Sequence, residues 1–172
     1  MRPVMVLIAA GLLAGCGDYS GRGSPGKAYD EALTAPNPVP PGKAGEDMVR
    51  RLNALEMIPE GAGMDAYFAA DISEAMKKDM AGDEVGAVSY DYRWNAQDFE
   101  VSDVAYQTMG LADGTGRVVV TFKNFGEFGT TLYDLCRRAD GTWRIFDVRS
   151  NDQDDGSLRH ALGLKRGEVT RC

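Results

Sequence analysis

The chain has 172 residues, 26% charged and 44% hydrophobic, so it is long enough for one ordinary domain and is not disordered as a whole. Its 19 lysines and arginines stand against 26 aspartates and glutamates, and this net charge of −7 excludes the basic footprint of a nucleic-acid-binding protein. One histidine and three cysteines exclude zinc sites made of several histidines or four cysteines. We expect no metal and no cofactor.

Residues 1–15 have the features of a secretory signal peptide. Arg2 supplies a positive charge, and the uncharged apolar run 4–14 is shorter than the about 20 residues that span a bilayer. Its end, Leu13-Ala14-Gly15-Cys16, resembles the lipobox of bacterial lipoproteins, which implies lipidation of Cys16. Gly17, in place of an aspartate, favours the inner leaflet of the outer membrane over the inner membrane. The alternative is an ordinary signal peptide that Cys16 merely follows.

Residues 16–44 are predicted to form the lipidated cysteine and a flexible tether. The stretch 17–43 holds five glycines and five prolines, and such a composition gives a flexible to extended chain. No proline follows Pro59. We therefore expect a single folded domain over 45–172.

The first half of this domain shows helical periodicity. Met48, Leu52 and Leu55 recur at helical spacing and predict a helix over 46–57. One or two further helices are expected over 64–80. Helices that precede a run of strands are typical of an α+β domain.

The second half shows four strand-like runs and two strong turn signals. The turn signals are Asp113-Gly114 and Asp140-Gly141, and they favour an antiparallel meander. A short C-terminal helix is expected over 157–162, ended by Gly163. The predicted strands are 99–108, 117–125, 130–138 and 142–149.

Strict alternation along the last strand predicts apolar residues on both of its faces. One face would carry Trp143, Ile145 and Asp147, and the other Arg144, Phe146 and Val148. A sheet with helices on one side and enough curvature to enclose something on the other fits this pattern, and so does a plain two-layer core.

Three segments carry a family resemblance. They are residues 90–98 (YDYRWNAQD), residues 133–135 (YDL) and residues 143–148 (WRIFDV), with Ser157-Leu158-Arg159 after the last strand. Together they resemble the DUF3828-type family of uncharacterised bacterial periplasmic proteins and lipoproteins, over roughly residues 48–164. The resemblance implies an NTF2-like layout, in which N-terminal helices pack on a curved antiparallel sheet of about four strands to form a cone. The family has no agreed activity, so the resemblance implies a fold and not a function.

The same segments supply the candidate binding residues. Asp98 and Asp147 would serve as acid and base if the domain were an enzyme, because glycoside hydrolysis uses such a pair of carboxylates. The structural alternative weighs more: Asp91 and Asp98 would bond backbone N–H groups in a loop, and Asp147 would close a network at the strand end. The candidate pocket residues are Asp91, Trp94, Gln97, Asp98, Trp143 and Asp147.

Two other polar features of the C-terminal region predict no site. His160 is expected at the surface of the last helix, and Ser157 beside it lacks the motif of an activated nucleophile. Residues 151–156 (NDQDDG) are expected to form a solvated turn, capped by Asp155 or Ser157, because Leu162 stands where a calcium loop needs a glutamate.

Cys136 and Cys172 remain once Cys16 is lipidated. Two leftover thiols usually pair in an oxidising compartment, so we predict a disulfide between them. The alternative is two free thiols, with Cys136 buried as a small apolar residue.

The favoured functional hypothesis is a membrane-tethered periplasmic binding lipoprotein, not an enzyme, that restrains a cell-envelope hydrolase or toxin. An acidic inhibitor suits a basic hydrolase because opposite charges speed their encounter. One alternative is an enzyme that acts on envelope glycan or a small metabolite through its carboxylate pair. Another is a structural envelope component that holds a protein through exposed aromatic residues such as Tyr92 and Trp94.

Overall fold

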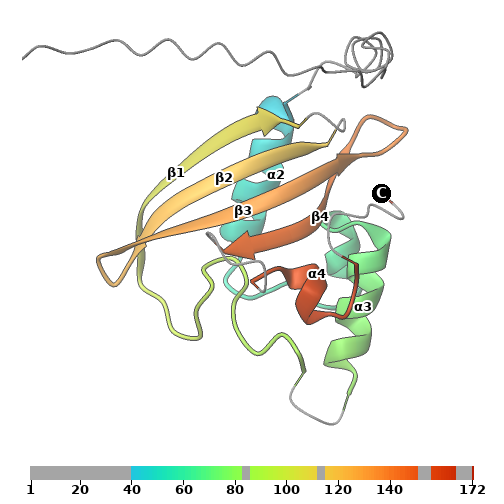
Figure 1. Cartoon of the computed structure of the whole chain (residues 1–172), viewed down its shortest axis with the longest axis horizontal. Coiled ribbons are helices and arrows are strands. Elements are labelled where there is room, and N and C mark those ends of the chain that lie inside the picture. The colour runs from blue at the N-terminus through green and yellow to red at the C-terminus, as the bar shows by residue number, and fades with distance from the viewer. Residues whose placement is uncertain (1–39, 83–85, 112–114, 151–155, 166–171) are drawn as a thin grey trace, which may run out of the picture. The chain divides into compact units, whose positions relative to one another are not determined.

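A computed structural model describes residues 40–82, 86–111, 115–150, 156–165 and 172. The predicted signal peptide, Cys16, most of the predicted tether and residues 151–155 of the predicted turn lie outside these residues. Within the described ranges, helices precede a four-stranded antiparallel sheet and a short helix follows it, so the expected α+β class is confirmed (Figure 1).

The sheet is a simple meander, in which each strand pairs with the next along the chain. Its strands are β1 (Val101–Gly110), β2 (Gly116–Asn124), β3 (Glu127–Arg137) and β4 (Trp143–Ser150). They agree with the four predicted runs to within three residues at each end. Of the two predicted turns, the one at Asp113-Gly114 lies outside the described residues. The one at Asp140-Gly141 is present: Gly141 has a φ of 84°, and Asp140 accepts hydrogen bonds from Thr142.

Helix α2 (Gly42–Asn53) lies across one face of the sheet (Figure 1). It begins and ends four residues earlier than predicted. Proline needs no hydrogen-bond acceptor for its nitrogen, so Pro41 fits the N-cap that it occupies. At the other end the chain leaves the helix at Ala54, where Arg93 binds the carbonyl groups of Leu52 and Leu55, as described below.

The predicted helical stretch 64–80 is interrupted, because its middle pairs with the sheet. A 3₁₀ helix, η1 (Gly61–Ala66), ends before Tyr67, and α3 (Ala70–Met80) begins after Ala69. Between them, Ala69 donates a hydrogen bond to the carbonyl of Ile145, and Ile145 donates one to the carbonyl of Tyr67. This short bridge covers part of the free edge of β4.

The strict alternation predicted for the last strand is wrong beyond Ile145. Leu135 pairs with Ile145 but Asp134 pairs with Asp147, so Phe146 is an extra residue on β4 and forms a bulge. The bulge reverses the faces that follow it. Val148 therefore joins Ile145 in the main core, whereas Phe146 packs in a second cluster with Cys136 and Ala69.

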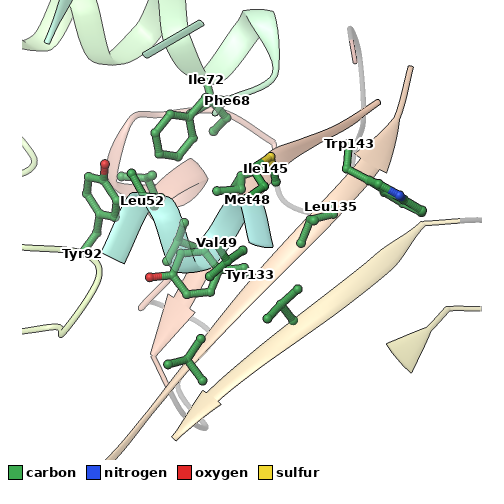
Figure 2. Close-up of a cluster of buried hydrophobic side chains, with 14 of the residues drawn as sticks. Met48, Val49, Leu52, Phe68, Ile72, Tyr92, Tyr133, Leu135, Trp143 and Ile145 are labelled. Atoms are coloured by element: carbon green, nitrogen blue, oxygen red, sulfur yellow. The ribbon is translucent and has the colours of Figure 1, made fainter. Parts of the chain in front are cut away.

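The main core lies between α2 and the sheet. Val49 and Leu52 of α2 are fully buried and lie near Tyr133 of β3, as Figure 2 shows. Tyr133 donates a hydrogen bond of 2.7 Å from its hydroxyl to Asn53 Oδ1, so this buried polar group is satisfied. The opposite face of the sheet carries ion pairs instead: Asp134 binds both Arg117 and Arg149.

The last helix, α4 (Leu158–Ala161), packs against β4. Ser157 is its N-cap and accepts a hydrogen bond from the backbone N–H of His160, which confirms one of the two predicted caps. His160 itself is exposed. In the described part of the chain, none of the helices has the length and apolar character needed to cross a bilayer.

Candidate functional site

A groove of about 380 Å³ opens between the loop after α2, the second half of α3 and the segment before β1. This volume is within the range of ligand-binding pockets. We call it the methionine groove. Its apolar lining consists of Met57, Ile58, Met76, Met80, Val88, Tyr92 and Phe99, and its polar lining of Glu56, Glu60, Asp79, Asp91, Arg93 and Gln97.

The apolar lining of the groove is open to solvent. Met57 is 70% exposed and Met80 48% exposed, whereas Met76 is buried beneath them. Methionine side chains are unbranched and polarizable, so they adapt to partners of different shape. The groove therefore offers adaptable apolar contact area rather than a rigid, enclosed cavity.

The rim of the groove carries negative charge. Glu56 and Glu60 are exposed, and neither forms an ion pair with another described residue. The carboxylate of Asp79 accepts hydrogen bonds from the backbone N–H groups of Ala87 (2.8 Å) and Val88 (3.2 Å), which holds the segment after α3 against the groove. Arg93 is the one cation among the described lining residues, and Asp91 neutralises it.

Arg93 and Asp91 form a buried, forked ion pair. Arg93 Nε lies 2.9 Å from Asp91 Oδ1, and Arg93 Nη2 lies 2.6 Å from Asp91 Oδ2. The third nitrogen, Nη1, donates to the carbonyl group of Leu52 (3.2 Å), in the last turn of α2, and to that of Leu55 (2.6 Å), just after the helix. Burial acts to lower the pKa of Arg93, but the hydrogen bonds and charge of Asp91 outweigh it, so the pKa is raised and the guanidinium stays charged.

The wall that contains this pair is fixed from several sides. Asp91 donates its backbone N–H to the carbonyl of Ala96 at 2.9 Å, which closes a tight loop. Thr131 of β3 donates its hydroxyl to the carbonyl of Arg93 at 2.9 Å. Segment 91–96 is thus bonded to both the sheet and α2, so this side of the groove is preorganised.

Tyr92 adds an unusual feature to the same wall. Its ring is 3% exposed and meets Phe68 edge to face, with 5.7 Å between the ring centroids. Its hydroxyl is buried and has no hydrogen-bond partner among the described residues. Burial raises the pKa of Tyr92, so the hydroxyl keeps its proton.

The six candidate pocket residues do not gather in one place. Asp91 and Gln97 line the methionine groove. Trp94 is buried against Phe122, with ring centroids 5.1 Å apart, and Tyr92 is buried as well, so the expectation that these two aromatic residues are exposed is wrong. Asp98 is exposed beside the groove, outside its described lining.

Trp143 and Asp147 lie on β4, away from these residues. Trp143 lines a different hollow, beside Met48 of α2. Asp147 is 2% exposed and accepts hydrogen bonds from Ser157 Oγ (2.8 Å) and from the backbone N–H of Arg159 (3.1 Å). Burial raises the pKa of Asp147 more than these hydrogen bonds lower it. This carboxylate therefore joins β4 to α4, and it does not face Asp98 across a cavity.

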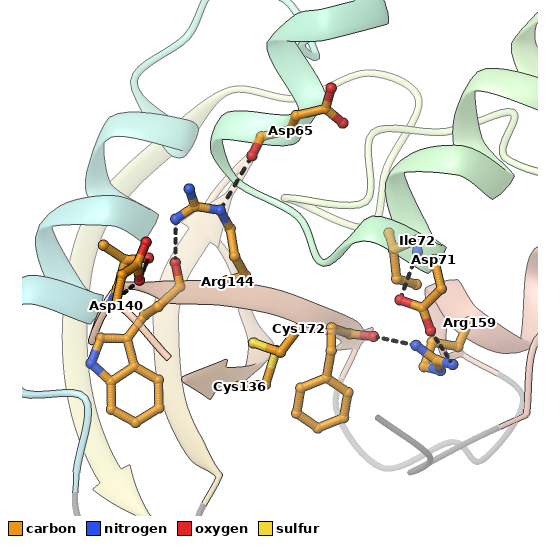
Figure 3. Close-up of a disulfide and its surroundings, with 11 residues drawn as sticks. Asp65, Asp71, Ile72, Cys136, Asp140, Arg144, Arg159 and Cys172 are labelled. Carbon is orange, nitrogen blue, oxygen red and sulfur yellow. Dashed lines mark hydrogen bonds and ion pairs between the residues drawn. A yellow bond between two sulfur atoms is a disulfide. The ribbon is translucent and has the colours of Figure 1, made fainter. Parts of the chain in front are cut away.

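Cys136 and Cys172 lie at disulfide distance, with their sulfur atoms 2.11 Å apart (Figure 3). Arg159 lies nearby and also binds distant segments together. It donates to Asp71 of α3 (2.9 Å), to the carbonyl of Phe146 (3.2 Å) and to the carbonyl of Lys165 (2.8 Å). The C-terminal region is thus attached to the domain by a covalent and an ionic connection.

Sequence reasoning missed the residues that shape the groove. Met57, Met76 and Met80 were visible as apolar residues, but no periodic pattern places the loop after α2 beside the end of α3. Arg93 lies inside the quoted segment 90–98, where an arginine two residues after an aspartate gives no sign of reaching α2.

In the described residues, no group of three or more histidine, cysteine, aspartate or glutamate side chains is arranged to hold a metal ion. Comparison of the chain with protein-family models, with curated proteins and with solved structures found no match in any of the three.

Proposed function

We propose that the protein is a lipid-anchored periplasmic binding protein, not an enzyme, which holds a basic partner in the methionine groove. The partner class is a cell-envelope hydrolase or toxin that the protein restrains. The observation that carries this proposal is an adaptable apolar groove with a negatively charged rim and a fixed wall.

The chemistry of the groove selects for a particular shape of ligand. An amphipathic helix can place apolar side chains on Met57 and Met80 while its lysines or arginines meet Glu56 and Glu60. The acidic character of the whole chain, with a net charge of −7, would also speed the encounter with a basic protein.

The alternative of an enzyme that uses Asp98 and Asp147 finds no support in this geometry. Acid–base catalysis needs both groups within reach of one substrate. Asp147 is buried and bonded to Ser157, whereas Asp98 is exposed in the segment before β1. We therefore propose binding without turnover.

The subcellular location in this proposal rests on the sequence around Cys16. A lipidated Cys16 would anchor the domain to the inner leaflet of the outer membrane, with the stretch up to residue 44 as tether. Membership of the DUF3828-type family and an NTF2-like cone belong to the same proposal. The packing of α2 on one face of a four-stranded meander supports that layout.

Two designed helical peptides test the binding proposal. One has a leucine face and a lysine face, and the other has glutamate in place of every lysine. The purified full-length chain is expected to bind the lysine peptide, more weakly as salt rises, and not the glutamate peptide. Equal binding of both peptides, or of neither, would contradict the proposal.

Variants locate the binding. Met80→Ser and the pair Glu56→Gln with Glu60→Gln are each expected to weaken binding of the lysine peptide by about fivefold, a change of about 1 kcal/mol. Met109→Ser and Asp98→Asn serve as controls, because Met109 is an exposed methionine of the sheet and Asp98 an exposed acid outside the described groove lining. The proposed lipid anchor is tested separately. Cys16→Ser should abolish incorporation of labelled fatty acid and release the protein from the membrane fraction.

A further inference from the structure

The turn between β2 and β3 holds a phenylalanine in a conformation that disfavours it. Asn124 pairs with Glu127, which leaves the two-residue turn Phe125-Gly126, with φ of 48° and 85°. Such a turn requires positive φ at both positions and favours Asn-Gly. A bulky residue there is strained. Phe125 is also 62% exposed, so burial of its ring does little to offset the strain.

A second exposed ring follows three residues later in the chain. Phe128 is 86% exposed, the highest value among the large hydrophobic residues in the described ranges. The turn is attached to the segment before β1, because Phe125 donates its backbone N–H to the carbonyl of Glu100 and Glu100 donates its own to Asn124 Oδ1. The two rings therefore stand on a braced turn, not on a free loop. We call residues 124–128 the hairpin tip.

The hairpin tip borders a hollow of about 580 Å³. Its aromatic lining comes from Trp94, Phe122, Phe125 and Phe128, and its one described charged lining residue is Glu127. In the described residues, this hollow shares none of its lining with the methionine groove. The inference below therefore does not depend on the function proposed for that groove.

The charges around the tip are negative. Glu100 and Glu127 are exposed and form no ion pair within the described ranges, whereas the nearby Lys123 is paired with Asp103 at 2.7 Å. Lys123 Nζ also lies 5.3 Å from the centroid of the Phe128 ring, so this ring already accepts a cation in the structure. Exposed aromatic faces beside a carboxylate form a site for a positively charged side chain.

We propose that the hairpin tip binds an arginine or lysine side chain of a basic protein partner, with the cation on the rings of Phe125 and Phe128 and its charge paired with Glu127. Arginine fits best, because its planar guanidinium can stack on a ring and bond a carboxylate at the same time. An anionic membrane surface is disfavoured as the occupant, since it would be repelled by Glu100 and Glu127.

The test uses a cation and its neutral isostere. Acetyl-arginine-amide and acetyl-citrulline-amide are titrated into the ¹⁵N-labelled full-length chain, and the amide shifts of residues 124–128 are followed. We expect saturable shifts at the tip with the arginine compound and not with the citrulline compound. Equal shifts with both, or shifts confined to other parts of the chain, would overturn the proposal.

Substitutions at the tip separate a cation site from a merely apolar one. Phe128→Leu keeps an apolar side chain but removes the ring, and Glu127→Gln removes the charge; each should weaken arginine binding about threefold. Met109→Leu, in which the exposed methionine is at the far end of β1, should leave it unchanged. Unchanged binding in both tip variants would overturn the proposal, as would tip-dependent pelleting with phosphatidylglycerol vesicles.

Phe125→Asn tests the argument from strain. Asparagine suits the turn and removes the ring, so this variant should unfold at higher urea concentration than the wild type and bind arginine more weakly. A lower urea midpoint would show that Phe125 stabilises the fold, and the strain would then give no reason to assign it a binding role.

Discussion

Arg93 Nη1 lies 2.6 Å from the carbonyl oxygen of Leu55, so a side chain from the segment before the sheet closes the end of helix α2. The same guanidinium is bonded to Asp91, and both side chains are at least nine-tenths buried. This contact joins the helix, the groove wall and, through Thr131, the sheet. It is the connection on which the shape of the methionine groove depends most.

Replacing Arg93 with methionine should therefore be severely destabilising. The change leaves Asp91 as a buried carboxylate without its ion-pair partner and removes the side-chain donor to the carbonyl groups of Leu52 and Leu55. Breaking a buried ion pair in this way costs about 3–5 kcal/mol. Urea unfolding gives the free energy of unfolding. Arg51→Met, at an exposed arginine of α2, is the matched control and should change it by about 0.5 kcal/mol or less. A loss below about 1 kcal/mol for Arg93→Met would contradict the buried pair.

Tyr92 and Tyr133 are both buried, but only the hydroxyl of Tyr133 has a hydrogen-bond partner among the described residues, so their replacement by phenylalanine should affect stability differently. Tyr92→Phe removes a buried hydroxyl that has no described partner, so it should leave stability unchanged or raise it by about 1 kcal/mol. Tyr133→Phe removes the donor to Asn53 and should lower stability by about 1–2 kcal/mol. Comparing the two variants by urea unfolding cancels the common loss of a hydroxyl group. Equal effects would mean that Tyr92 has a partner outside the described residues.

The pair Cys136 and Cys172 closes a loop across a sequence separation of 36. On the chain-entropy account, a disulfide of this span stabilises the folded chain by about 3–4 kcal/mol. Cys172→Ser should lower the free energy of unfolding by about that amount, and reducing agent should destabilise the wild type but not this variant. If reductant lowered the stability of both proteins equally, the bond would not be the source of the difference.

The stability of the fold should depend on pH through Asp147. Burial raises the pKa of this carboxyl above 3.8 in the folded chain, so the folded state holds the proton more tightly than the unfolded state does. The stabilisation from this proton is present below pH 3.8 and is lost as the pH rises through the folded-state pKa.

Asp147→Asn cannot titrate, so it isolates this contribution. The free energy of unfolding of the wild type, measured relative to Asp147→Asn, should fall as the pH rises from acid towards neutral. Urea unfolding of both proteins at a series of pH values checks this. A difference that stays constant would mean that the hydrogen bonds from Ser157 and Arg159 balance burial, and one that grows with pH would mean that they outweigh it.

Local patterns were sufficient for the strands and for one turn and one helix cap, but not for the break in the helical stretch 64–80. Alternation and turn residues predicted the four strands, and Asp140-Gly141 and Ser157 were placed correctly in a turn and a cap. These features depend on residues close in the chain, which is why sequence reasoning reached them. It failed at Phe146, because a bulge is set by how β4 pairs with β3 and not by the residues of β4 alone.

Such local patterns could not predict the candidate site. The groove forms where three separate segments meet, and the bonds of Arg93 to Leu52 and Leu55 span 41 and 38 positions. Asp147 was a candidate pocket residue with a favoured structural alternative, a network at the strand end, and its hydrogen bonds from Ser157 and Arg159 match that alternative. Composition and periodicity determine which secondary structure each segment can form. Which segments contact one another depends on packing and on the pairing of buried charges, and these are decided only in the folded tertiary structure.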